Sequence, residues 1–206
     1  ARTGLPVSVE NDANCVLLAE RWQGKAAEMA NFLVLTIGTG IGGAIFCQHQ
    51  LINGARFRAG EFGYMLTDRP GGRDPRRYSM NENCTLRVLR HRYAEHIAAP
   101  LESVTGEMIF DRYDAGDPVC QRLVAEFFNG LGHGLYTLVH IFDPQAIFIG
   151  GGVVERPGFL TLLRQHLAWF GIADYLDTVS HGNDAGLIGA VYHFNQLYRS
   201  PDDDRH

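Results

Sequence analysis

The sequence has few cysteines and few cations. Only 4 of the 206 residues are cysteine, and none of them forms a CxxC pair. This spacing gives no indication of a disulfide framework or a zinc knuckle, and it suggests a reducing compartment. Lys and Arg number 18 against 23 Asp and Glu, which gives a net charge of −5. Because a nucleic-acid backbone requires clustered cations, we do not expect nucleic acid as the main partner.

Long apolar runs and several well-known motifs are also missing. No run approaches the roughly 20 residues that a bilayer-spanning helix needs, and no signal peptide is visible, so we expect a cytoplasmic protein without a membrane partner. Neither the GxSxG of hydrolases nor the GxxxxGK[ST] phosphate loop occurs. The first residue is Ala1 rather than Met. We therefore expect an N-terminal region upstream of it.

A glycine-rich stretch between two apolar runs, residues 32–46, is the strongest feature. It contains Gly38, Gly40, Gly42 and Gly43. The spacing matches the dinucleotide fingerprint GxGxxG, but residues 44–52 lack a helical period, so a strand or loop follows instead of a helix. We expect a hairpin whose backbone amides grip a phosphate. Thr36 and Thr39 would add hydroxyl donors; the alternative is a glycine hairpin without a ligand.

A second glycine cluster, Gly150, Gly151 and Gly152, follows an apolar strand over residues 146–149. A helical pattern over residues 158–170 comes next. This order is typical of a turn that cradles a nucleotide at a helix N-terminus. A tight strand-to-helix turn without a ligand is the alternative.

Asp12 lies where a predicted strand (residues 6–10) meets a predicted helix (residues 15–28). Asp12 or Asn14 could cap that helix, which is the commonest role of Asp at such a place. A carboxylate at the end of a strand is also well placed for catalysis. Glu61 lies between Gly60 and Gly63 in a loop, where it either binds a ligand or is simply exposed. Residues 67–83 are polar and indicate an exposed excursion.

Further elements follow from periodicity and capping signals. Helices are expected over residues 84–97, 107–113 and 184–194, and a strand over residues 177–181. Asp117 and Pro118 predict the start of a long helix that ends near residue 141. Its glycines at positions 130, 132 and 134 suit close packing.

Four stretches in this order, residues 9–14, 36–43, 59–63 and 149–152, resemble the ROK family (repressors, open reading frames and sugar kinases). Residues 186–190 fit as well. The resemblance implies an α/β fold of the actin/hexokinase (ribonuclease H-like) ATPase type and transfer of the ATP γ-phosphoryl group to a sugar. In that reading Asp12 is the catalytic base, while Asn11 and Glu61 bind sugar hydroxyls. The glycine hairpin then holds the phosphates, and Gly150 to Gly152 border the adenosine.

Departures from the family pattern refine this expectation. The family's His after Gly-Glu-x-Gly is Tyr64 here, and its sugar-binding Glu after the zinc motif is Leu86. Of the zinc cysteines only Cys84 remains, and one cysteine cannot make a four-coordinate site, so we expect no zinc. Tyr64 and Leu86 would offer apolar surface beside C1 and C2 of the sugar, which suits a substituted anomeric oxygen, with a second sugar or an aryl group stacking on Tyr64. The hypothesis is a kinase for β-glucosides such as cellobiose, similar to the β-glucoside kinases of enteric bacteria.

The resemblance also divides the chain. Residues 1–30 would end the small N-terminal lobe, residues 31–184 would form the large C-terminal lobe, and residues 185–206 a terminal helix with a frayed tail. The family's first phosphate motif, which supplies the Asp for Mg²⁺, is not in the sequence, so we expect this chain alone to be inactive. The alternatives are a free-hexose kinase and the sugar-sensing part of a ROK repressor. A homodimer is consistent with the family.

Overall fold

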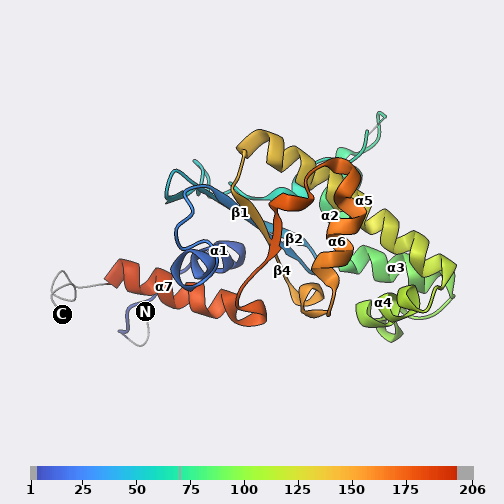
Figure 1. Cartoon of the computed structure of the whole chain (residues 1–206). Coiled ribbons are helices and arrows are strands. Elements are labelled where there is room, and N and C mark those ends of the chain that lie inside the picture. Colours follow the sequence, from blue (N-terminus) through green and yellow to red (C-terminus); the bar gives the residue numbers. More distant parts are fainter. Residues whose placement is uncertain (1–3, 70, 199–206) are drawn as a thin grey trace.

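A single five-stranded mixed sheet organises the computed structural model, which describes residues 4–69 and 71–198 (Figure 1). The strand order is β3-β2-β1-β4-β5. β1 pairs antiparallel with β2 and parallel with β4, and β4 pairs parallel with β5. The bounds are β1 Phe32–Ile37, β2 Ile41–Cys47, β3 Gln50–Leu51, β4 Ala146–Gly150 and β5 Leu176–Thr178.

Helices cover both faces of this sheet (Figure 1). α1 and α7 pack together on one face, and α3 to α6 lie on the other. The helices are α1 Asp12–Gln23, α2 Met80–Asn83, α3 Leu86–His96, α4 Gly106–Asp114, α5 Pro118–Phe142, α6 Phe159–Leu167 and α7 Ala185–Tyr198. None of the helices in the described ranges is both long and apolar enough to cross a bilayer.

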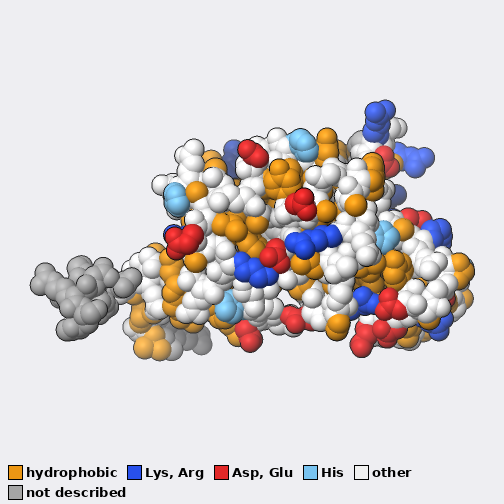
Figure 2. Space-filling model, viewed as in Figure 1, with side chains coloured by type: hydrophobic (Ala, Val, Ile, Leu, Met, Phe, Trp, Pro, Cys, Tyr) orange, Lys and Arg blue, Asp and Glu red, His pale blue; other side chains and the backbone are white. Residues whose placement is uncertain are grey.

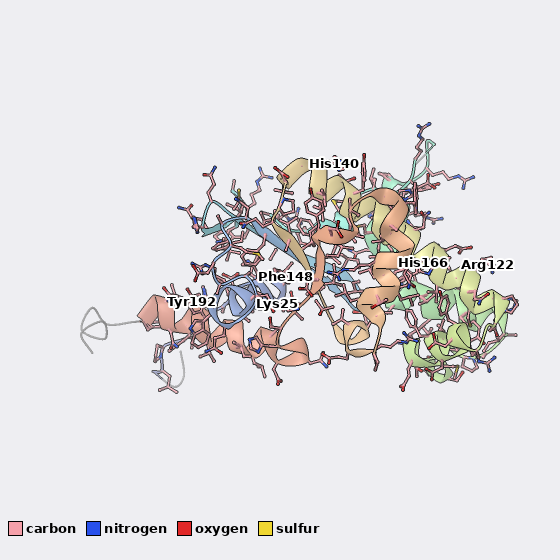
Figure 3. The ribbon with its side chains drawn as sticks, viewed as in Figure 1. Lys25, Arg122, His140, Phe148, His166 and Tyr192 are labelled. Carbon is pink, nitrogen blue, oxygen red and sulfur yellow. The ribbon has the colours of Figure 1, made fainter. Side chains whose placement is uncertain are left out.

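Side chains along β1 alternate between the two faces of the sheet, which explains why its residues 32–35 are all apolar. Leu33 and Leu35 belong to the large core beneath α5, whereas Phe32 and Val34 belong to the smaller core beneath α1. A strand with both faces covered buries every second side chain on each side. Phe148 of β4 joins the smaller core, beside α1 (Figure 3).

The long central helix begins and packs as the sequence predicts. The Asp117 carboxylate accepts hydrogen bonds from the amides of Val119 (2.9 Å) and Cys120 (3.1 Å), and Pro118 is the first helical residue. A Cβ added to Gly134 would lie 2.4 Å from Met80 Sδ, so Met80 packs closely against α5 at this glycine. The capping and close-packing predictions are confirmed.

Several predicted elements differ from the structure. Residues 6–10 form no strand, because no described strand lies beside them to pair with. α1 begins three residues earlier than expected, at Asp12, and β5 spans Leu176–Thr178 instead of residues 177–181. The helix expected over residues 158–170 is present as α6, which begins at Phe159, and a 3₁₀ turn at Gly152–Glu155 separates it from the glycines. The predicted frayed tail at 201–206 lies outside the described residues.

Residues 67–83 are exposed over only part of their length, so the predicted exposed excursion is confirmed in part. Its middle is exposed, but Ser79 and Met80 are buried and α2 forms at its end. Met80 reaches into the large core, which explains why the chain turns inward there. On the face shown in Figure 2, basic and acidic side chains are interspersed.

Candidate active site

The glycine hairpin and the second glycine cluster meet at the carboxyl ends of β1 and β4. Thr36 of β1 is the register partner of Gly42 in β2 and of Gly150 in β4. Gly151 has φ +99°, and a Cβ there would lie 2.2 Å from the Ile37 carbonyl oxygen. Only glycine therefore permits this turn. In open α/β sheets this edge is the usual place for ligands.

Asp12 opens α1, and the helix cap is its neighbour Asn11. Asn11 Oδ1 accepts hydrogen bonds from the amides of Ala13 (2.9 Å) and Asn14 (3.3 Å). The predicted cap at Asp12 or Asn14 is thus wrong. Asp12 Oδ1 accepts from the Ala13 amide (2.8 Å), and its Oδ2 accepts from no group in the described ranges. Its carboxylate is exposed in the first helical turn, where the helix dipole favours negative charge.

Two cavities open on either side of Asp12. The Glu61 cavity, about 380 Å³, is lined by Asn11, Asn53, Phe57 and Glu61 among others. The hairpin cavity, about 410 Å³, is lined by Thr36, Thr39, Gly38, Gly40 and Gly151 among others. Asp12 and Gly42 line both. One carboxylate therefore faces two spaces, which is the arrangement that transfer of a group between two bound molecules requires.

A third and larger cavity continues from the hairpin cavity. The Arg156 cavity has a volume of about 660 Å³ and shares Gly152 with the hairpin cavity. The Arg156 guanidinium lies 5.2 Å above the centre of the Phe110 ring and pairs with Asp114. The lining of this cavity combines apolar and aromatic side chains with acidic ones. It has the size and character of a small-molecule site.

Most of the sequence-predicted residues come together in this row of cavities. Asn11, Asp12, Gly43 and Glu61 line the Glu61 cavity, and the Glu61 side chain makes no hydrogen bond in the described ranges. Gly150 is not among the lining residues. It lies beneath them, where an added Cβ would lie 3.3 Å from Val179 and 3.4 Å from Thr36.

Two predicted sugar contacts lie elsewhere. Tyr64 ends a short 3₁₀ turn after Glu61, and 65% of its surface is exposed, but it does not line the Glu61 cavity. Leu86 lines the Arg156 cavity, and its amide donates to the Gly38 carbonyl (3.1 Å). Leu86 is the first residue of α3, which Thr85 caps, and a Cβ added to Gly106 at the start of α4 would lie 3.8 Å from a Leu86 methyl group.

Among the lining residues that sequence reasoning missed, three belong to the two cavities beside Asp12. Asn81 Oδ1 accepts the Ile41 amide (2.7 Å) and so connects α2 to the glycine hairpin. Asn53 Oδ1 accepts from the Asn14 side chain (3.3 Å). Phe57, an aromatic residue in a polar loop, lines the Glu61 cavity. Of the three, only Phe57 carried a sequence signal, because a large apolar side chain is unusual among arginines and glycines.

The family model described as the ROK family matches residues 1–196. The chain belongs to the ROK family. It is 97% identical over 205 residues to the β-glucoside kinase of Klebsiella pneumoniae, an alignment that covers 100% of the chain and 69% of that kinase. The chain therefore spans about 69% of the length of this relative.

Solved ROK structures share the fold. A ROK family protein from Streptococcus pneumoniae, in complex with sucrose, aligns with a TM-score of 0.84 at 28% identity, over 94% of the chain and 67% of that protein. A ROK family glucokinase from Streptomyces griseus, in complex with glucose and AMPPNP, aligns with a TM-score of 0.79 at 26% identity, over 95% of the chain and 70% of that protein. The predicted actin/hexokinase-like α/β fold is confirmed.

Cys84, the residue left from the family's zinc motif, is buried. Burial raises the pKa of the Cys84 thiol to about 12, and its Sγ donates to the Met80 carbonyl (3.2 Å). Zinc binds the thiolate. No cluster of three or more His, Cys, Asp or Glu side chains with metal-binding geometry occurs in the described ranges. The absence of zinc remains a prediction.

Proposed function

We propose that the protein transfers the γ-phosphoryl group of ATP to the 6-hydroxyl of the non-reducing glucose of β-glucosides such as cellobiose. The observation that carries this proposal is the position of Asp12 on the wall between the Glu61 cavity and the hairpin cavity. The 97% identity to a β-glucoside kinase supports the reaction and the substrate class.

In this mechanism the Glu61 cavity holds the glucose ring. Asn11 uses its oxygen to cap α1, so its amide NH₂ can donate to a sugar hydroxyl. The Glu61 carboxylate, which has no partner in the described ranges, accepts from sugar hydroxyls. Asp12 orients the 6-hydroxyl and takes its proton as the new P–O bond forms. Phosphoryl transfer needs positioning and charge neutralisation more than covalent participation of the protein.

The hairpin cavity takes the phosphates, and the Arg156 cavity takes the adenosine. A Cβ at Gly38 or Gly40 would meet no protein atom closer than 3.4 Å, so the space over these glycines is open to a ligand. Thr36 and Thr39 supply hydroxyls. The AMPPNP complex of the Streptomyces griseus glucokinase supports an ATP donor. Leu86, as a wall of the Arg156 cavity, would then contact the nucleotide and not the sugar.

Mg²⁺ would neutralise charge on the ATP phosphates. Asp12 is the only carboxylate in the hairpin cavity, so the described residues alone do not make a magnesium site. We propose that the main magnesium ligand belongs to the part of the relatives' length that this chain does not span. On this proposal the 206 residues alone are inactive. We further place the longer protein in the cytoplasm, as a homodimer without zinc.

ADP release measured with cellobiose, salicin and glucose tests this function, on the protein extended to the full length of its relatives. We expect the highest kcat/KM for the β-glucosides. A far higher kcat/KM for glucose would instead identify a free-hexose kinase. Sugar binding without turnover of any of the three would identify a sensor, as in a ROK repressor. Turnover by the 206 residues alone would contradict the need for the remaining part.

A further inference from the structure

Phe57 combines two features that are unusual together. Its φ is +53°, in the left-handed region that bulky residues avoid, and 84% of its surface is exposed. Despite that exposure, it lines the Glu61 cavity together with Asp12 and Glu61. Phe57 therefore lies at the open rim of the cavity.

The stability of the fold does not account for an aromatic ring at this position. A left-handed backbone is unfavourable for Phe and costs glycine nothing. Burial would offset that cost, but Phe57 is almost fully exposed and belongs to neither core. Strained residues of this kind concentrate at ligand sites.

The loop that carries Phe57 is anchored at both ends. On one side, Asn53 bonds to Asn14 of α1 through their side chains (3.3 Å) and to the Ala59 amide through its carbonyl (3.2 Å). On the other side, a Cβ at Gly60 would lie 2.5 Å from the Gly43 carbonyl oxygen, so the loop packs directly on the glycine hairpin. These contacts fix the base of the loop relative to Asp12. The ring is thus presented at a defined place.

We propose that Phe57 is the platform on which the second ring of a β-glucoside stacks, and that it selects glucosides over free glucose. The inference rests on the proposed function. With the 6-hydroxyl at Asp12, the glucose ring fills the inner part of the cavity. A β substituent on the anomeric oxygen is equatorial and extends outward, toward the rim. There the apolar face of a sugar or an aryl ring can cover the exposed aromatic surface.

This inference moves the stacking residue away from Tyr64. Tyr64 is also exposed, but it does not line the Glu61 cavity. Among the described residues that line the Glu61 cavity, Phe57 is the only aromatic one.

The test compares Phe57→Ala, Phe57→Gly and Phe57→Trp in the full-length protein, with kcat/KM measured for salicin, cellobiose and glucose. We expect the Ala and Gly variants to lose about tenfold for both glucosides, mainly through KM, with less than about a twofold change for glucose, because one stacked ring is lost. Phe57→Trp should keep the preference for glucosides over glucose.

Phe57→Gly should melt no lower than wild type, since glycine accepts the backbone conformation. Trp169→Ala, at an exposed aromatic outside all three cavities, is the matched control.

Each outcome separates this inference from the proposed function. If wild type does not turn over the glucosides, both are overturned. If wild type does, but Phe57→Ala changes nothing or reduces glucose and glucoside turnover equally, only the role of Phe57 is overturned. Loss of glucoside preference in Tyr64→Ala, with none in Phe57→Ala, would return the stacking role to Tyr64.

Discussion

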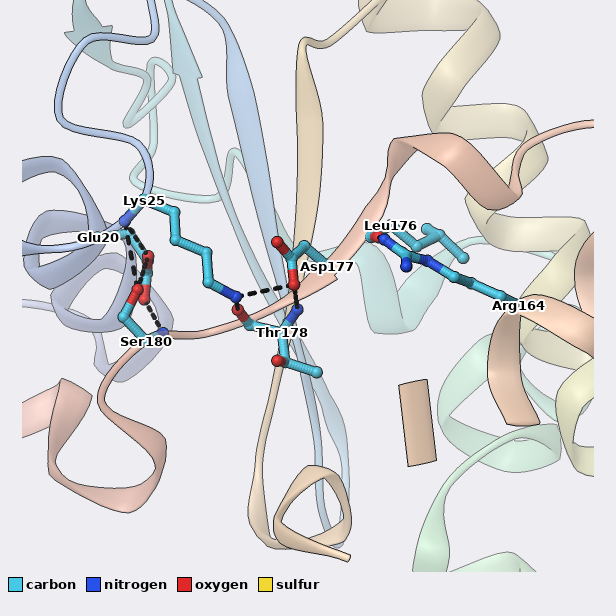
Figure 4. Close-up of polar contacts among 7 residues, drawn as sticks. All are labelled: Glu20, Lys25, Arg164, Leu176, Asp177, Thr178 and Ser180. Carbon is cyan, nitrogen blue, oxygen red and sulfur yellow. Dashed lines mark hydrogen bonds and ion pairs between the residues drawn. The ribbon is translucent and has the colours of Figure 1, made fainter. Parts of the chain in front are cut away.

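The buried carboxylate of Glu20 binds both the backbone amide and the hydroxyl of Ser180 (Figure 4). The hydroxyl donates to Glu20 Oε2 at 2.9 Å, and the Lys25 amide donates to the same oxygen at 3.1 Å. Glu20 is fully buried in α1, the helix that begins with Asp12, and Ser180 follows β5. This contact, with the ion pair between Lys25 and Asp177 (2.8 Å), fastens the helix of the candidate base to the sheet.

Replacing Glu20 with Gln should therefore destabilise the protein. The amide nitrogen of Gln would face groups that donate, and a buried donor left unpaired costs about 1–3 kcal/mol. Urea unfolding measures the change. Ser180→Ala, which removes one of the three donors and leaves the carboxylate paired, should cost less. Equal stability of Glu20→Gln and wild type would contradict this account.

In the protein extended to the full length of its relatives, Asp12→Asn should abolish most of the activity without unfolding the protein. A general base typically contributes about 10²–10⁴-fold, so kcat should fall by that order while KM for the glucoside changes little. Helix α1 keeps its start, because Asn11 provides the cap. Circular dichroism of the variant checks the fold. A kcat within a few-fold of wild type would exclude Asp12 as the base.

In the same extended protein, Asn81 should control ATP binding at the hairpin cavity, the proposed phosphate site. Its Oδ1 accepts the Ile41 amide at 2.7 Å. Asn81→Asp keeps the acceptor but adds a negative charge to the hairpin cavity, so KM for ATP should rise at least about tenfold while KM for the glucoside stays constant. Asn81→Ala removes the bond without adding charge, and it separates loss of hairpin support from charge repulsion. A KM for ATP that is unaffected in Asn81→Asp would place the phosphates elsewhere.

Cys84 should resist alkylation in the folded protein. With its pKa raised to about 12 by burial, almost no thiolate exists at pH 8. We expect iodoacetamide at pH 8 to modify the partly exposed Cys47 first and Cys84 only after unfolding in urea. Peptide mass mapping identifies the modified residues. Early modification of Cys84 in the native protein would show that this part of the core opens readily.

His166 should make the protein less stable in mild acid. It lies on α6 (Figure 3) and stacks on Phe128 with ring centres 4.9 Å apart, and burial lowers its pKa below the ordinary 6.5. Between that lowered pKa and 6.5 the unfolded chain binds a proton that the folded protein does not. Stability should therefore fall as the pH drops through 6.5. His166→Gln cannot titrate, so its unfolding free energy should change less between pH 7 and pH 5. Parallel pH profiles would contradict this.

Short sequence patterns predicted those elements whose ends are determined by residues that are close together in the chain. The glycine hairpin follows from two apolar runs around four glycines, and the start of α5 follows from Asp117 and Pro118. Composition alone gave a wrong prediction at residues 6–10. These residues have a strand-like composition, but no described strand lies beside them to form hydrogen bonds. A strand is a property of two segments, so composition alone cannot establish it.

By itself the sequence determined the hairpin, the long helix, the ordered ROK motifs and Asp12, Asn11 and Glu61 as candidate site residues. Only the tertiary structure showed that Asp12 lies between two cavities, that Asn81 supports the hairpin, that Leu86 lies in the Arg156 cavity and that Phe57 lies at the rim near Glu61. The physical reason is distance along the chain. Asn81 reaches Ile41 across 40 residues, and such contacts follow from packing, which no local pattern encodes.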